Sequence, residues 1–232
     1  MTRARRRPTR RRAPPTRGPQ RSRTAARRRG PPARDTRADL FHHAAEMFSA
    51  RGFDAVGVDE IARAAGVNKA MLYYHFRDKL DLYREVVRDM LRDFGSRVGA
   101  LADTTDSPDV KVRHFVATFI ALTEARPWGP PLMLREMADG APHLDLETLK
   151  LMRDVFARFS RILAEGQASS VFHPVHPILA YMSIIAPLLL NAARERAARP
   201  PGRADLPMFV TVSHDELSQH MQRAAVRLLA KD

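Results

Sequence analysis

One short stretch of the chain carries most of its chemistry. We predict a helix at residues 69–76, in which Leu72 and Phe76, four residues apart, should point into a core. The side chains left on the outer face are those of Lys69, Ala70, Met71, Tyr73, Tyr74 and His75. The ammonium group of Lys69 can donate to guanine acceptors or to a phosphate, and the two residues after it can pack on thymine methyl groups.

A preceding helix should position this outer face. It is expected to begin at Thr36, because residues 36–39 (TRAD) have the Ser/Thr-x-x-acid form of a capping box. Gly52 can supply the positive φ that ends it, and Phe53 can then fold back onto its apolar face. That face repeats at helical spacing through Leu40, Ala44, Met47 and Phe48.

A turn and a capping residue should set the direction of the exposed helix. We predict a short helix at residues 58–65, a tight turn at Gly66, and Asn68 as the N-cap of the exposed helix. Two short helices joined by a glycine-centred turn, the second exposing basic and aromatic groups, are typical of a helix-turn-helix. We place this unit at residues 57–76.

The same residues match a known pattern. The run GFDAxxVDEIARAAGVNKAMLYYHFRDK resembles the DNA-binding domain of the TetR family of bacterial transcriptional regulators. The resemblance covers residues 36–83, with AxxAGV, LYYHF and the Lys that follows in register. It implies binding to double-stranded DNA at a palindromic operator, a homodimer, and a second helical domain that binds a small effector.

The resemblance also implies roles for individual side chains. Tyr73 and His75 match phosphate-contacting positions, whereas for Tyr74 a DNA contact and packing against the first helix remain open. Asp78 is a good N-cap for a fourth helix, which would place Lys79 in its first turn beside a phosphate. The predicted DNA-binding residues are Asn68, Lys69, Ala70, Met71, Tyr73, Tyr74, His75 and Lys79.

The chain departs from the family pattern at three places. Val56 and Gly57 stand where Ser or Thr is common, so a hydroxyl that caps the second helix and touches phosphate is missing. Glycine can still act as the N-cap, at a cost of about a few tenths of a kcal/mol. Met71 stands where Thr is common, which changes the expected operator, and Asn68 replaces Ser with little effect on capping.

The positive charge of the chain is concentrated at its start. Residues 1–34 hold 14 Arg and no Asp, Glu or Lys, while the other 198 residues hold 25 of the 39 Lys and Arg against 26 acids, a net charge of −1. Such an Arg/Pro-rich segment cannot bury enough apolar surface to fold, so we expect a disordered tail. It lacks the apolar region of a signal peptide. We interpret it as a mobile arm on DNA phosphates, with a solubilising tail and a misassigned start codon as alternatives.

The remaining sequence predicts helices and no strands. A long helix from about residue 80 should link a DNA-binding domain at 35–82 to an effector-binding and dimerisation domain at 83–232. A short helix is expected at residues 132–138 after a proline-rich stop. The expected inward positions are Leu82, Val86, Met90 and Phe94; Val112, Phe115, Val116, Phe119 and Leu122; Leu149, Met152, Phe156, Phe159 and Leu163; and Leu217, Met221, Ala224 and Leu228. The predicted fold is all-α, with about nine helices.

Residues 177–198 predict a helix that is apolar on nearly every side. Its most apolar run, residues 178–190, has thirteen residues, too few for a bilayer span of about twenty. We therefore expect the helix to be buried on every side, with no membrane involved. By resemblance, this helix and the last one, residues 215–230, form the interface of the homodimer that a two-fold operator requires.

The second domain offers aromatic and Met side chains for a ligand. Such residues at helical spacing are usually core, but they can also line an adaptable pocket. The candidates are Phe115, Phe119, Trp128, Met133, Met137, Met152, Phe156 and Phe159. An apolar or amphipathic effector suits these side chains, and Arg135, Glu136 and His143 are candidates to fix its polar end.

The other reactive groups indicate no further site. His173 and His176 lie in a proline-flanked loop with no Cys or nearby carboxylate, so we predict no metal and no cofactor. No catalytic motif occurs, so an enzyme is not expected. The leading hypothesis is a cytoplasmic, nucleoid-associated dimeric repressor that an apolar effector releases from DNA. The alternatives are a low-specificity DNA-coating protein driven by the Arg-rich tail, and a small-molecule binding protein or enzyme with a vestigial helix-turn-helix.

Overall fold

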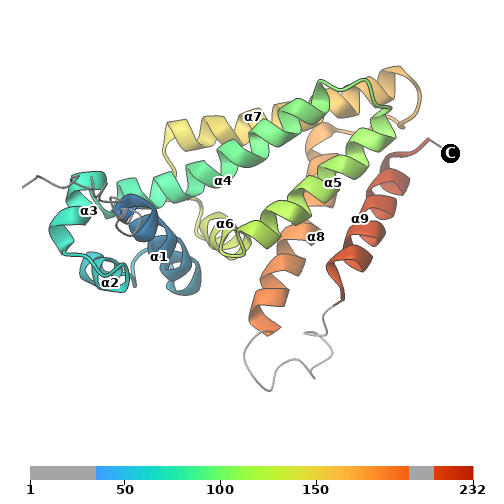
Figure 1. Cartoon of the computed structure of the whole chain (residues 1–232). Helices are drawn as coiled ribbons and strands as arrows, with labels where there is room; N and C mark the ends of the chain where they lie inside the picture. The colour runs from blue at the N-terminus through green and yellow to red at the C-terminus, as the bar shows by residue number, and fades with distance from the viewer. Residues whose placement is uncertain (1–34, 199–211, 232) are drawn as a thin grey trace, which may run out of the picture. The chain divides into compact units, whose positions relative to one another are not determined.

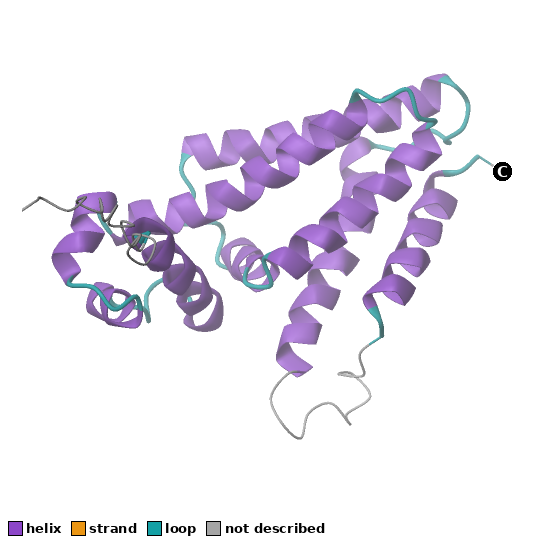
Figure 2. Ribbon diagram, viewed as in Figure 1, coloured by secondary structure: helices purple, strands orange, loops and turns teal. Residues whose placement is uncertain are grey.

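The computed structural model describes residues 35–198 and 212–231, and these residues form nine α-helices and no strand (Figures 1 and 2). Their one β-type contact is an isolated bridge between Phe172 and Ala230. The all-α prediction is therefore confirmed. The Arg-rich segment 1–34, for which disorder and DNA contact were predicted, lies outside the described residues.

The first three helices pack around one small core. They are α1 (Thr36–Arg51), α2 (Val58–Ala64) and α3 (Lys69–His75). The side chains that meet between them are fully buried: Leu40, Ala44, Phe48, Ile61, Ala65 and Leu72. The predicted helix-turn-helix is thus present, with α3 as its second helix.

Helix α1 starts differently from the prediction and ends as predicted. Asp35 and not Thr36 is its N-cap, and the Asp35 carboxylate accepts from a first-turn backbone N–H at 3.1 Å. Aspartate caps at least as well as threonine, so the earlier carboxylate takes the position. At the other end Gly52 has φ 82°, and the ring of Phe53 stacks on that of Phe48 with centroids 5.9 Å apart.

Helix α4 (Lys79–Ala102) connects the helix-turn-helix to the rest of the fold. Asp78 caps it as predicted, accepting from the backbone N–H of Asp81 at 2.7 Å. Its predicted inward residues are all buried: Leu82, Val86, Met90 and Phe94. The helix continues without a break through residue 82, so the predicted domain boundary falls inside it.

Five further helices follow α4. They are α5 (Pro108–Ala125), α6 (Gly129–Ala138), α7 (Leu146–Ala168), α8 (Pro177–Ala198) and α9 (His214–Leu229). Helices α5, α6 and α7 pack against α4. Figure 1 shows α7 running beside α4, and α5 lies against α9. Helix α6 begins at Gly129, earlier than the predicted residue 132, because Pro130 and Pro131 fit its first turn, where no N–H is needed.

Most predicted inward positions are buried or half-buried, and two are exposed. Leu149 is 45% exposed, and in the first turn of α7 the fully buried residue is Thr148. Leu228 is 44% exposed, whereas Ala225 and Leu229 of α9 are buried. In α9, and in the first turn of α7, the buried stripe is one position away from the predicted one, because a 3.6-residue period leaves neighbouring registers nearly equivalent in sequence. Further along α7, Phe159 and Leu163 are buried as predicted.

Helix α8 is not buried on every side within one chain. Its exposed apolar residues are Ile178, Leu179, Met182 and Leu190, at 41%, 61%, 37% and 65% exposure. Pro177–Arg196 is a stretch of 20 residues that is long and apolar enough to cross a membrane by length and composition, so the shortness argued from residues 178–190 does not hold. Core helices of soluble proteins meet the same criterion, and α8 packs against α5, α6, α7 and α9.

Candidate DNA-binding surface and effector cavity

The candidate recognition surface is the outer face of α3. Asn68 is its N-cap and accepts from the backbone N–H of Met71 at 3.0 Å, so the amide fixes the direction of the helix. Lys69 is exposed and its Nζ lies 3.1 Å from a carboxylate oxygen of Asp59, in an ion pair that is open to solvent. Ala70 is also exposed. Both residues lie in the first turn, which is the part of such a helix that reaches base edges.

The aromatic residues of α3 differ in how far they protrude. Tyr73 is 50% exposed and Tyr74 79% exposed. Packing of Tyr74 against the first helix, one of the two alternatives left by the sequence, does not occur at this exposure. His75 is half-buried and its Nε2 is enclosed, so Nδ1 is the ring nitrogen left to face solvent. The ring centroids of Tyr74 and His75 are 5.0 Å apart.

Lys79 has a structural contact that the sequence did not reveal. Its Nζ donates to the carbonyl oxygens of Phe53 and Val56, at 3.0 and 3.1 Å, and lies 4.0 Å from the centroid of the Phe53 ring. The ammonium group therefore ties the start of α4 to the loop that precedes α2. Two of its three donors are used in this way, and one remains for another acceptor.

The start of α2 shows how the chain manages without the hydroxyl common in the family. Gly57 is the N-cap, and the carboxylate of Glu60 accepts from its backbone N–H at 2.9 Å. Arg51 of α1 donates to both oxygens of Glu60, at 3.0 and 3.2 Å. These bonds, that of Arg51 first, lower the pKa of Glu60. These contacts hold the start of α2 against the end of α1.

A second candidate site is a partly open cavity of about 420 Å³ lined by α4, α5, α6, α7 and α8. This volume is in the range of small-molecule pockets, about 300–1,000 Å³. Five of the eight predicted effector residues line it: Phe119, Met133, Met137, Met152 and Phe156. The other three lie elsewhere. Phe115 and Phe159 are fully buried, with ring centroids 4.9 Å apart, and Trp128 packs edge-on against Phe41.

Much of the cavity wall was not predicted. Helix α4 contributes Met90, Leu91 and Phe94, and α8 contributes Ile178, Tyr181, Met182, Ile185 and Leu189. The sequence analysis predicts α8 only as part of the dimer interface, but a helix that is apolar on every side can also turn one side to a cavity. Burial raises the pKa of the Tyr181 phenol to about 12, so this wall residue stays neutral.

The residues proposed for a polar end of the ligand are not in this cavity. Glu136 is 3% exposed and accepts from the Tyr83 hydroxyl at 2.8 Å, and it pairs with Nδ1 of His143. The His143 ring lies 4.3 Å, centroid to centroid, from that of Phe53. These groups form a buried junction between α4, α6 and the loop after α1. Burial and the bond to Glu136 raise the pKa of Tyr83.

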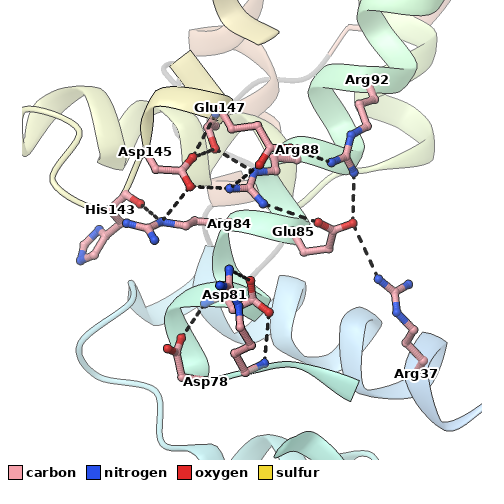
Figure 3. Close-up of polar contacts among 12 residues, drawn as sticks. Arg37, Asp78, Asp81, Arg84, Glu85, Arg88, Arg92, His143, Asp145 and Glu147 are labelled. Atoms are coloured by element: carbon pink, nitrogen blue, oxygen red, sulfur yellow. Dashed lines mark hydrogen bonds and ion pairs between the residues drawn. The ribbon is translucent and has the colours of Figure 1, made fainter. Parts of the chain in front are cut away.

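A network of ion pairs holds α4 to its neighbours (Figure 3). Arg88 is almost buried and lies among Asp145, Glu147 and Glu85, with its Nη2 3.2 Å from Glu147. Glu85 also lies 3.7 Å from Arg37 of α1. The network therefore runs from the start of α7 across α4 to α1.

Asp145 is both a member of this network and the N-cap of α7. Burial alone would raise the pKa of its carboxyl. Hydrogen bonds from the Thr148 backbone and hydroxyl, together with the charges of Arg88 and Arg84, outweigh burial and lower that pKa. The carboxylate is thus held ionised by its partners.

The His173–His176 loop has a structural explanation. Nε2 of His173 lies 2.9 Å from the Leu228 carbonyl oxygen and Nδ1 lies 3.1 Å from that of Pro174. The ring thus joins the loop before α8 to the end of α9. Within the described residues no group of three His, Cys, Asp or Glu side chains is arranged to hold a metal ion.

Comparison with known proteins gives consistent matches to regulators. Residues 40–86 match the family model described as "Bacterial regulatory proteins, tetR family". The transcriptional activator FasR of Mycolicibacterium smegmatis is 38% identical over 93 residues, which are 40% of this chain and 42% of FasR. The repressor KstR2 of the same organism is 39% identical over 87 residues, 37% of this chain and 42% of KstR2. The matches thus span less than half the length of these two relatives.

Two further matches extend over more of the fold. TtgW of Pseudomonas putida, an uncharacterised HTH-type transcriptional regulator, is 30% identical over 114 residues, which are 43% of this chain and 85% of TtgW. The structure of the ketosteroid transcriptional regulator KstR2 of Mycobacterium tuberculosis superposes with a TM-score of 0.68 at 21% identity, over 84% of this chain and 95% of that one. The second likeness concerns the fold.

Proposed function

Because the chain belongs to the TetR family of bacterial regulatory proteins, we propose that it is a dimeric repressor that a small, mostly apolar effector releases from a palindromic operator. The observation that carries the proposal is the placement of α4. Its first residue, Lys79, ties down the loop before the recognition unit, and Met90 and Phe94 of the same helix line the cavity. A ligand in the cavity therefore contacts the helix that positions α3.

The proposed DNA contacts are those of the α3 face. Lys69 reads a guanine or holds a phosphate, and Met71, in place of a hydroxyl side chain, selects an apolar feature such as a thymine methyl. Tyr73, Tyr74 and the remaining donor of Lys79 take phosphates, which fix register and orientation. His75 contributes through Nδ1. Asn68 acts by capping α3 and not by reading bases.

The proposed dimer forms through α8 and α9. A palindromic operator presents two half-sites related by a two-fold axis, so two copies of α3 must be held at a fixed spacing. The exposed apolar residues of α8, with Leu179 and Leu190 the most exposed, supply a surface that a second copy can cover in an isologous interface. Burial of these residues in a dimer also accounts for the apolar character of α8 without a membrane. We place the protein in the cytoplasm, bound to DNA.

The proposed effector is apolar for most of its length. The cavity wall consists almost entirely of Met, Leu, Ile and aromatic side chains, which adapt to apolar molecules. KstR2 is described as a ketosteroid regulator, which is in keeping with an apolar ligand. FasR is described as an activator and KstR2 of M. smegmatis as a repressor, so the direction of control is part of the proposal.

The test compares the full chain with a chain that starts at Asp35, which is a compact unit by itself. Both are bound to the DNA upstream of the gene, with scrambled DNA as competitor, over a salt series. We expect both to select the same palindromic site, with a steeper salt dependence for the full chain because the arm neutralises additional phosphates. Loss of selectivity in both would overturn the proposal, and selectivity-free binding by the full chain alone would favour DNA coating. A promoter fusion then tests repression.

A further inference from the structure

The effector cavity is apolar except for a small number of groups that carry charge. Of the 19 residues that line it, the charged ones are Arg126 and Arg153, both positive. An anion that leaves water for an apolar site needs a cationic partner. Arg153 is largely exposed and its nearest partner is Asp154 at 3.3 Å. Arg126 is 23% exposed and is the better-placed of the two.

Arg126 already has partners, and both are on α4. Its Nε and Nη2 donate to one oxygen of Asp89, at 3.2 and 3.1 Å, and its Nη1 donates to Asp93 at 2.6 Å. Asp89 and Asp93 are one turn apart, so they present their carboxylates on the same face of the helix. A single guanidinium group that lines the cavity therefore holds α4 against the end of α5.

We propose that the effector carries an anionic head group, which Arg126 and Arg153 bind while the apolar body fills the cavity, and that it competes with Asp89 and Asp93 for Arg126. The inference rests on the proposed function and names the chemical class of its effector. A head group that takes these donors removes the link between α5 and α4. Because Lys79 of α4 also holds the loop before α2, loss of the link between α5 and α4 alters the position of the recognition helix α3.

The head group is tested with three probes that share a twelve-carbon chain: dodecanoate, dodecanol and dodecyltrimethylammonium. Each is titrated calorimetrically into the full chain below its micelle concentration. We expect dodecanoate to bind at least tenfold more tightly than dodecanol, and the ammonium probe to bind most weakly. Equal binding of acid and alcohol, or a preference for the ammonium probe, overturns the proposal.

Two substitutions with opposite expected effects test the competition. Arg126→Gln should remove most of the advantage of dodecanoate over dodecanol. Asp89→Asn, at a half-buried position that does not line the cavity, should tighten dodecanoate binding severalfold because it removes a competitor, and unchanged or weaker binding overturns the competition. Arg161→Gln is the matched control, since this arginine of α7 does not line the cavity and pairs with Asp103 at the surface.

Operator binding without any probe separates the two proposals. If the operator is selected but the head group makes no difference, the effector class is wrong and the repressor stands. If no operator is selected while dodecanoate binding depends on Arg126, the anion site stands without the regulatory function. When both hold, dodecanoate should weaken operator binding by the wild type, and Arg126→Gln should bind the operator more weakly than the wild type with no ligand present.

Discussion

Replacing Lys79 by Met tests whether this residue is a structural tie as well as a DNA contact. The substitution keeps the length of the apolar stem and removes the ammonium group. The carbonyl oxygens of Phe53 and Val56 then lose their donor, and the Phe53 ring loses its cation at 4.0 Å. A residue that only touched phosphate would leave the stability of the free protein unchanged.

The expected loss follows from the two hydrogen bonds. Bonds that involve a charged group contribute about 1.5–3 kcal/mol each, so the gross loss is about 3–6 kcal/mol. Two effects reduce it: water can solvate the partly exposed carbonyls, and the ordered lysine chain regains up to about 2 kcal/mol of rotamer entropy. Subtracting the entropy leaves about 1–4 kcal/mol, and solvation of the carbonyls lowers it further, so we expect Lys79→Met to lower the free energy of unfolding by about 2 kcal/mol.

Urea unfolding followed by helical circular dichroism measures this change. Lys150→Met is the control, because Lys150 is an exposed lysine on α7, away from α3. The free energy of unfolding of Lys79→Met should fall clearly below that of the control. In addition, operator binding by Lys79→Met should lose about 0.9 from the slope of log affinity against log salt if the third donor meets a phosphate. Unchanged stability, within about 0.5 kcal/mol of wild type, would refute the structural role.

Three other predictions concern the second half of the chain. Gly166→Ala should destabilise the fold by about 1–3 kcal/mol in urea unfolding, because the added Cβ would lie 2.0 Å from the buried ring of Phe172. Because the pKa of Asp145 is lower in the folded protein, its ionised carboxylate stabilises the fold at pH values above the ordinary pKa of 3.8. This contribution is lost as the pH falls through the lower folded pKa. Below about pH 4 the free energy of unfolding should therefore fall more steeply with pH for wild type than for Asp145→Asn. Leu190→Glu should convert the proposed dimer to a monomer in size-exclusion chromatography without unfolding it, since Leu190 is 65% exposed in a single chain; a persistent dimer would place the interface elsewhere.

The helix-turn-helix could be predicted from the sequence because its determinants are local. Gly66 has φ 69° as a tight turn requires, and Asn68 and Asp78 cap the helices that follow them. Each of these features acts within four residues of the chain. The one error, Thr36 in place of Asp35 as the first cap, arose between two adjacent residues that can both cap a helix.

The cavity could be predicted only in part, because its wall is made by contacts that are distant in sequence. Helical spacing shows that Phe115, Phe119 and Phe159 face inward, but it does not say which of them meets another ring and which meets a cavity. The tie between Lys79 and Phe53, and that between Arg126 and Asp89, join residues 26 and 37 positions apart. Composition and helical spacing do not show which residues of two distant segments will meet.

The continuity of α4 across residue 82 limits how this regulator could acquire a new DNA specificity by exchange of its N-terminal helices with those of a relative. A crossover at residue 82 would combine a foreign residue 37 with the native Glu85, and a foreign Phe53 position with the native His143. A hybrid made in this way inherits half of each contact pair. Exchanges that carry α4 to its last turn together with α1–α3 keep the pair of residues 37 and 85 but still separate Phe53 from His143. Substitution of only the exposed face of α3 keeps both pairs intact and is the route by which DNA specificity can be changed on the same fold.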